Sequence, residues 1–263
     1  DLVLRQTLLF GGLESIARNR NYKNNNLKFY EFGNCYHFHN EKRSSENALS
    51  SFSEDLHLGL WICGNKTAQS WVQKEEKSTV FELKAHVENI LIRIGINQNN
   101  IVVEKLTNDI YSDALQINTK RGEELVVFGC VNKNILNGFD IDAEVFFADL
   151  NWTNLMREIR NHKITYVDIP KFPEVRRDLA LLLDKNVTFA EIEKIAYETE
   201  KKLLKRVNLF DVYEGKNLPI GKKSYAVSFI LQDSEKTLKD AQIDAIMQRL
   251  IKNLTEKIGA SLR

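Results

Sequence analysis

The sequence predicts an α+β fold made of two domains, and three features of the 263-residue chain support this. Short apolar runs typical of strands outnumber helical stripes in the first two thirds, which favours a mostly antiparallel sheet there. Strand and helix patterns alternate regularly toward the C-terminus. Between the two regions, Pro170 and Pro173 lack the amide donor that regular structure needs, which favours a linker. We therefore divide the chain into residues 1–169 and 170–263.

The composition excludes two classes of protein. With 43% hydrophobic and 28% charged residues, the chain differs from disordered sequences. The chain has 37 Lys and Arg residues against 36 Asp and Glu residues, a net charge of +1. This excludes a strongly basic protein that binds nucleic acid through its overall positive charge. The charge is unevenly distributed, because residues 170–263 carry a net charge of +4 and residues 1–169 a net charge of −3. The two parts are therefore expected to meet different partners.

The sequence also predicts a soluble, cytoplasmic protein. No apolar run approaches the roughly 20 residues that a membrane helix needs, and no signal sequence precedes the first elements. The three cysteines, Cys35, Cys63 and Cys130, are odd in number and lack CxxC spacing. We interpret them as reduced core thiols, with no disulfide and no metal site.

Residues 1–169 contain two predicted helices and five predicted strands. Apolar residues at helical spacing from Leu4 to Ala17 predict the first helix. Thr79 and Glu82 have the spacing of a capping box and predict the start of the second, which Gly95 closes. The strand candidates are Leu27–Phe32, Leu56–Cys63, Leu115–Ile117, Leu125–Val131 and Val145–Leu150.

Residues 170–263 repeat a strand, a helix and a strand twice. Each helix follows a capping-box pattern, Thr188 with Glu191 and Thr237 with Asp240. This order is typical of a ferredoxin-like βαββαβ domain, in which the helices cover one face of the sheet and leave the other face open. The predicted strands are Leu179–Leu183, Val207–Tyr213, Ser224–Leu231 and Ala260–Leu262.

The open face of this second sheet is the strongest candidate site. Asp211 and Tyr213 are two residues apart and share one side of their strand, so we expect Phe210 and Val212 beneath the helices. Ser224 on the next strand is expected beside Tyr213. An aromatic ring, a carboxylate and a hydroxyl are what an unstacked nucleobase needs, although each is also common in purely structural roles. Nearby lysines, Lys222 and Lys223, supply candidate phosphate contacts, or simply a solvated face.

Four blocks of residues 170–263 resemble, in order and spacing, the ferredoxin-fold anticodon-binding domain of the bacterial phenylalanyl-tRNA synthetase beta subunit family. They are Phe172–Leu181, Leu209–Gly215, Leu218–Ala226 and Thr237–Asp240, followed by the terminal Leu262-Arg263. The resemblance implies that the anticodon contacts Ala180, Asp211, Tyr213 and Ser224, with the ring of Tyr213 stacking on its first base. Arg177 joins Lys222 and Lys223 as a candidate phosphate contact.

The N-terminal part looks like the catalytic-like domain of the same family. The matching runs are Leu4–Leu13 and Leu27–Gly33. The resemblance implies a class II synthetase-like antiparallel fold that packs against the catalytic alpha subunit without aminoacylating. The run Phe29–Gly33 lacks the arginine with which class II enzymes hold ATP phosphates. We therefore expect a non-catalytic piece with no cofactor or metal of its own, ATP and magnesium serving the parent complex.

The resemblance implies the C-terminal part of a phenylalanine-tRNA ligase beta subunit, within a heterotetrameric enzyme. This piece would bind the tRNA anticodon and support the alpha subunit in ATP-dependent charging of tRNA with phenylalanine. The implied partners are phenylalanine-accepting tRNA and the alpha subunit, with no membrane and no DNA. One alternative is a ferredoxin-like small-molecule-binding regulator or free-standing enzyme, which needs paired carboxylates in a concave site or a phosphate loop. Another is a purely structural assembly domain.

Overall fold

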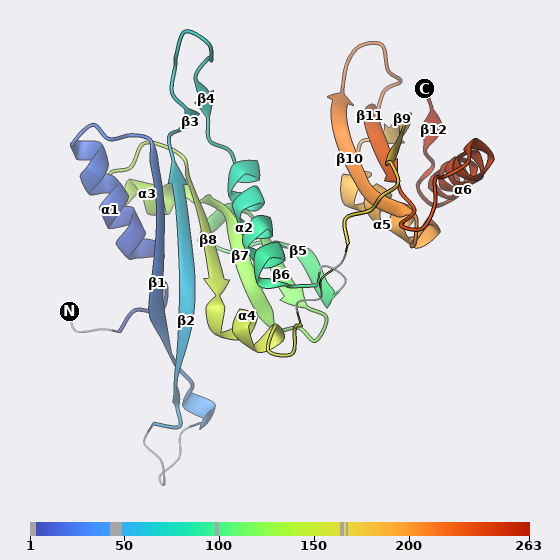
Figure 1. Ribbon diagram of the computed structural model, residues 1–263. Coiled ribbons are helices and arrows are strands. Elements are labelled where there is room, and N and C mark those ends of the chain that lie inside the picture. Colours follow the sequence, from blue (N-terminus) through green and yellow to red (C-terminus); the bar gives the residue numbers. More distant parts are fainter. Residues whose placement is uncertain (1–3, 43–48, 98–99, 164–165, 167) are drawn as a thin grey trace. The chain divides into compact units, whose positions relative to one another are not determined.

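A computed structural model describes the chain except for residues 1–3, 43–48, 98–99, 164–165 and 167. The chain divides into two compact units, residues 1–164 and 165–263 (Figure 1). Each unit packs helices against an antiparallel sheet, which confirms the predicted α+β fold class. None of the helices in the described part of the chain is long and apolar enough to span a membrane.

The first unit is built on a six-stranded antiparallel sheet in the order β1-β2-β8-β7-β6-β5. All five predicted strands are present and are longer than expected, whereas β5 was not predicted. A separate pair, β3 (Asn65–Thr67) and β4 (Glu76–Lys77), projects from the end of β2. The sheet strands are β1 (Leu27–Phe38), β2 (Phe52–Cys63), β5 (Ile101–Leu106), β6 (Tyr111–Thr119), β7 (Glu124–Val131) and β8 (Val145–Asn151).

Helices cover both faces of this sheet, so the unit has two apolar cores. On one face, α1 (Leu9–Asn21) and α3 (Lys133–Asn137) pack over Trp61 and Phe147. On the other, α2 (Val80–Ile94) and α4 (Trp152–Glu158) pack over a second set of strand side chains. A 3-10 turn, η1 (Asn40–Lys42), follows β1.

The predicted helix starts in the first unit are partly correct. The stripe from Leu4 predicted a helix that in fact begins only at Leu9. Thr79 is the N-cap of α2, as predicted, but its side chain makes no capping hydrogen bond. The helix ends at Gly95, whose φ of 90° is the left-handed conformation that glycine adopts most readily.

The second unit has the predicted βαββαβ order, with the sheet arranged β10-β11-β9-β12. Its helices, α5 (Phe189–Thr199) and α6 (Asp240–Ile258), pack on one face over a single core around Phe229. None of the helices described in this unit lies on the other face. The strands are β9 (Val175–Asp184), β10 (Leu204–Tyr213), β11 (Lys222–Leu231) and β12 (Ser261–Leu262).

The two capping-box predictions in this unit have opposite outcomes. At α5 the box is complete, because the Thr188 hydroxyl accepts from the Glu191 amide and the Glu191 carboxylate accepts from the Thr188 amide at 2.7 Å. At α6 the prediction is wrong, because the N-cap is Lys239 and no side chain caps the helix. The helix begins two residues too late for Thr237 to reach its free amides.

Candidate functional site

The helix-free side of the second sheet is called here the open face. Leu181, Val227 and Phe229 lie in the core beneath α5 and α6. Because side chains alternate along a strand, their neighbours point the other way. The open face consists of Arg176, Asp178, Ala180 and Leu182 on β9, Arg206, Asn208, Phe210, Asp211 and Tyr213 on β10, and Lys222, Ser224, Ala226, Ser228 and Ile230 on β11.

A β-bulge in β10 decides which side chains reach the open face. Leu209 pairs with Val227 and Asp211 pairs with the adjacent Ala226, so Phe210 is an extra residue. Simple alternation would place Leu209 and Asp211 on the same face, but the bulge puts Leu209 in the core and Asp211 outside. The prediction that Phe210 lies beneath the helices is wrong, since 48% of it is exposed.

The structure brings the four predicted anticodon residues together. Ala180, Ala226 and Asp211 are register partners across β9, β11 and β10, and form one row. Ser224 and Tyr213 are partners in the next row. Ala180 and Asp211 are exposed and Tyr213 is partly exposed, whereas Ser224 is only 6% exposed. The open face therefore offers a ring and a carboxylate beside two small alanine side chains.

An arginine covers part of this site. The guanidinium carbon of Arg263 lies 5.2 Å from the centre of the Tyr213 ring, a cation–π contact. The backbone amide of Arg263 donates to the carbonyl of Ala180, which fixes the terminal residue at the edge of β9. Because β9 and β11 lie between Arg263 and Tyr213, the contact bridges the open face above Ala180 and Ala226.

The three predicted phosphate contacts lie in different places. Lys222 is on the open face and pairs with Asp184 at 2.9 Å. Lys223 points to the helix side, is 6% exposed and donates to the hydroxyl of Tyr225. Arg177 also points to the helix side, with its guanidinium 3.7 Å from Asp240. Lys223 and Arg177 are therefore not part of the open face, and their role as phosphate contacts stays a prediction.

On β9, Arg176 rather than Arg177 lies on the open face. Its guanidinium carbon lies 5.0 Å from the centre of the Phe210 ring. The sequence did not lead us to place Arg176 or Phe210 on the open face, although one signal for Arg176 was available. Since the resemblance implies that Ala180 contacts the anticodon, alternation along β9 places Arg176, and not Arg177, on the same side as Ala180.

One face of the first unit carries a row of carboxylates. Glu31 and Asp149 flank Gly59 in register across β1, β2 and β8. The guanidinium of Arg5 binds Glu31 at 2.6 Å. The Nδ1 atom of His57 lies 2.6 Å from Asp149, and although burial alone would lower the pKa of His57, this hydrogen bond and the charge of Asp149 raise it. The row is acidic and internally paired.

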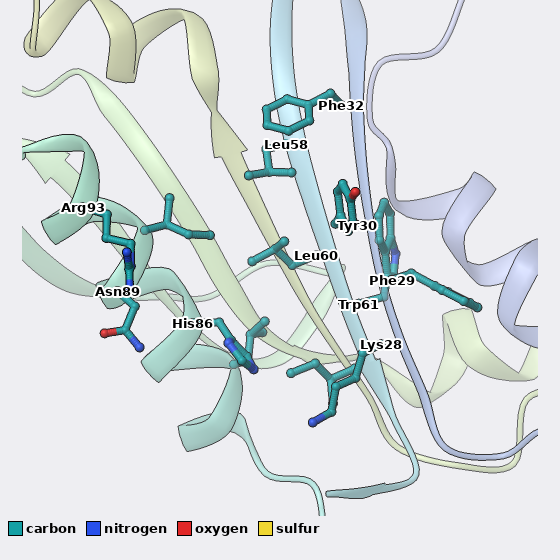
Figure 2. Close-up of a pocket in the computed structure, with 13 residues that line it drawn as sticks. Lys28, Phe29, Tyr30, Phe32, Leu58, Leu60, Trp61, His86, Asn89 and Arg93 are labelled. Atoms are coloured by element: carbon teal, nitrogen blue, oxygen red, sulfur yellow. The ribbon is translucent and has the colours of Figure 1, made fainter.

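The first unit also has an apolar hollow of about 440 Å³ between α2 and the strands β1 and β2 (Figure 2). Tyr30 and Phe32 form its wall on β1 and are 75% and 49% exposed. The ion pair between Lys28 and Glu82 and the edge-to-face contact between Phe32 and Trp152 lie beside it. The other lining residues are Phe29, Leu58, Leu60, Trp61, Ile62, Leu83, His86, Asn89, Ile90 and Arg93.

Two family models match the chain. Residues 170–263 match the ferredoxin-fold anticodon binding domain. Residues 2–152, more than half of the chain, match the phenylalanyl tRNA synthetase beta chain CLM domain. The chain belongs to the phenylalanyl-tRNA synthetase beta chain family. This confirms the resemblance inferred from the sequence blocks of both parts.

Relatives of this family align with nearly all of the chain. Phenylalanine–tRNA ligase beta subunits of Bacteroides thetaiotaomicron, Porphyromonas gingivalis and Fusobacterium nucleatum are 62%, 52% and 31% identical to it. Each alignment covers 99% of this chain but 32% of the relative. The chain thus spans about a third of the length of these beta subunits. The alternative of a small-molecule regulator or free-standing enzyme is not favoured.

The carboxylate row does not suit ATP, the cofactor that the synthetase family implies. Phosphates need cationic groups, but Glu31 and Asp149 project on this face and Arg5 is already paired with Glu31. Among the described residues, no three or more His, Cys, Asp or Glu side chains are grouped to hold a metal ion. The residues of this row therefore do not fit a nucleoside triphosphate.

Proposed function

We propose that residues 170–263 bind the anticodon of phenylalanine-accepting tRNA through Ala180, Asp211, Tyr213 and Ser224. The observation that carries this proposal is the register that sets Tyr213 beside the row of Asp211 and Ala180. A ring supplies a stacking surface, a carboxylate accepts from a base amino group, and a methyl side chain lets a base approach the sheet. Lys222, at the end of the face, suits a phosphate.

Arg263 also belongs to the proposed anticodon site. Its guanidinium lies over the ring of Tyr213, so a base that stacks on that side displaces it. A displaced guanidinium close to bound RNA is attracted to a phosphate, because arginine binds phosphate oxygens in a forked geometry. Ser224, shielded in this structure, becomes accessible as Arg263 and Tyr213 shift.

The whole protein, in this proposal, is the beta subunit of a heterotetrameric phenylalanine-tRNA ligase in the cytoplasm. ATP and magnesium serve the alpha subunit, which carries the chemistry, and the present residues are non-catalytic. The carboxylates Glu31 and Asp149, which are paired with Arg5 and His57, support the assignment of the chemistry to the alpha subunit. Cys35, Cys63 and Cys130 are free thiols, in keeping with a reducing compartment.

Replacing Tyr213 by alanine tests the anticodon assignment. Loss of one base-stacking contact, worth about 1–3 kcal/mol, is expected to weaken binding of phenylalanine tRNA by about fivefold to 150-fold. The measurement is filter binding with the full-length beta subunit in complex with alpha. Because the ring of Tyr213 holds the base beside the Asp211 carboxylate, the variant is also expected to discriminate less between the cognate tRNA and one with a substituted anticodon.

Tyr197→Ala is the matched control, because Tyr197 is 37% exposed on α5, in the same unit but away from the open face. It is expected to bind tRNA like the wild type. Equal affinities of Tyr213→Ala and the wild type for cognate tRNA would remove the stacking role.

We further propose that the apolar hollow of the first unit receives the alpha subunit. Two exposed aromatic side chains beside an apolar floor, on the edge strand β1, form a surface typical of protein interfaces. Tyr30→Ser is expected to weaken association with alpha by about tenfold, as truncation of an interface aromatic commonly does. Co-purification and analytical ultracentrifugation measure this.

Tyr22→Ser provides the control for this second proposal. Tyr22 is 76% exposed, nearly the same as Tyr30, but follows α1 and does not line the hollow. Association is expected to be unchanged in this variant. If Tyr30→Ser and Tyr22→Ser assemble equally well with alpha, the hollow is not the subunit interface.

A further inference from the structure

A second aromatic–arginine pair occupies the half of the open face away from Tyr213. Phe210 is 48% exposed on the bulge of β10, and Arg176 lies on β9. Their separation of 5.0 Å, from guanidinium carbon to ring centre, is that of a cation–π contact. An apolar ring held this far out of the core by a bulge is unusual for a purely structural phenylalanine, because burying it would be more favourable.

Arg176 is held in place by its own strand neighbour. Its Nε and Nη2 atoms donate to the two carboxylate oxygens of Asp178 at 2.8 and 3.1 Å. This forked pairing fixes the plane of the guanidinium while the side chain stays 55% exposed. Arg176 thus presents an oriented planar surface to the solvent.

The side chains of Arg176 and Phe210 together cover part of β11. Because β11 lies between β9 and β10, the contact from Arg176 to Phe210 crosses above β11. Ser228 and Ile230 are the β11 side chains on that part of the open face, and they are 2% and 7% exposed. Their burial on this face is explained if the Phe210 ring and the Arg176 guanidinium cover them.

Short side chains cover the sheet between Phe210 and Tyr213. Phe210 and Tyr213 flank Asp211 on β10, and the row beside Asp211 contains the small side chains of Ala226 and Ala180. A flat ligand can approach the sheet there with an aromatic ring on either side. Two neighbouring bases of a single strand need such a succession of stacking surfaces.

We propose that Phe210 and Arg176 form a second nucleobase-stacking site, which takes an unpaired base of the bound RNA next to the base on Tyr213. The inference rests on the proposed anticodon-binding function and extends it. The site offers two stacking surfaces, the Phe210 ring and the guanidinium plane of Arg176, whose Nε and Nη2 atoms donate to the Asp178 carboxylate. It therefore adds affinity without reading the identity of the base, since every base has a π face.

Phe210→Ala and Phe210→Trp in the full-length beta subunit, in complex with alpha, test this site by filter binding. Removal of the ring is expected to weaken binding about fivefold to 100-fold, by the same factor for cognate tRNA and anticodon-substituted tRNA. Tryptophan keeps an aromatic surface and is expected to restore most of the affinity. Circular dichroism checks that both variants are folded.

The outcomes separate this inference from the function on which it rests. If Tyr213→Ala weakens binding and Phe210→Ala does not, the second site is refuted and the anticodon proposal stands. If both variants bind like the wild type, the anticodon proposal itself fails. If Phe210→Ala weakens binding but Phe210→Trp is no better, the ring acts through packing and the stacking site is overturned.

Discussion

Phe229→Ala is expected to lower the free energy of unfolding of the second unit by about 3–5 kcal/mol. Phe229 is fully buried, and its register partner on β10 is the buried Val207. Truncation leaves a cavity between the sheet and the helices α5 and α6, which share this core. Because small domains are stable by only about 5–15 kcal/mol, this is a large fraction of the total.

Two spectroscopic signals separate the units in this experiment. The three tryptophans, Trp61, Trp71 and Trp152, all belong to the first unit, whereas far-UV circular dichroism reports on both. Urea unfolding of Phe229→Ala is expected to show an earlier circular dichroism transition and an unchanged tryptophan transition. Phe210→Ala is the control, since it makes the same exchange at an exposed site and is expected to cost less than about 1 kcal/mol. Equal destabilisation by both variants would contradict the burial argument.

Local signals in the sequence predicted most of the elements. Thr188 and Glu191 cap α5 as expected, because both groups belong to one turn and need no tertiary partner. The similar pattern at Thr237 failed, since the chain turns into α6 only at Asp240. The edge strand β5 was missed because its middle residues are exposed, so no alternation between buried and exposed side chains marks it.

The candidate site depends on features that strand alternation cannot show. Asp211 and Tyr213 share a face as predicted, but they reach the open face only because a bulge separates them from Leu209. A bulge needs no distinctive residue, so the position of Phe210 could not be predicted from spacing. On β9 the uninterrupted apolar run Leu179–Leu183 hides which side is buried, so the run alone could not show that Arg176, and not Arg177, lies on the open face.

The second large effect is expected at Trp61 in the first unit. Trp61 is 2% exposed, and its ring centre lies 5.0 Å from that of Phe147. The indole fills the space left by two residues without side chains, Gly12 on α1 and Gly59 on β2. Trp61→Ala is expected to destabilise the first unit by about 3–5 kcal/mol, measured by the unfolding transition of the remaining tryptophans.

Helix α1 approaches Trp61 closely at Gly12. The effect of Gly12→Ala on stability is therefore expected to change sign when the indole is removed. In the wild type, Gly12→Ala places a Cβ atom in overlap with the indole ring and is expected to cost about 1–3 kcal/mol. In the Trp61→Ala background the overlap is gone, and the same substitution is expected to stabilise by up to about 1 kcal/mol, because alanine favours a helix over glycine. Gly11→Ala, with nothing within 4 Å of its Cβ, is expected to be neutral or stabilising in both backgrounds. A Gly12→Ala effect that is the same with and without the indole would show that Trp61 does not set the position of α1.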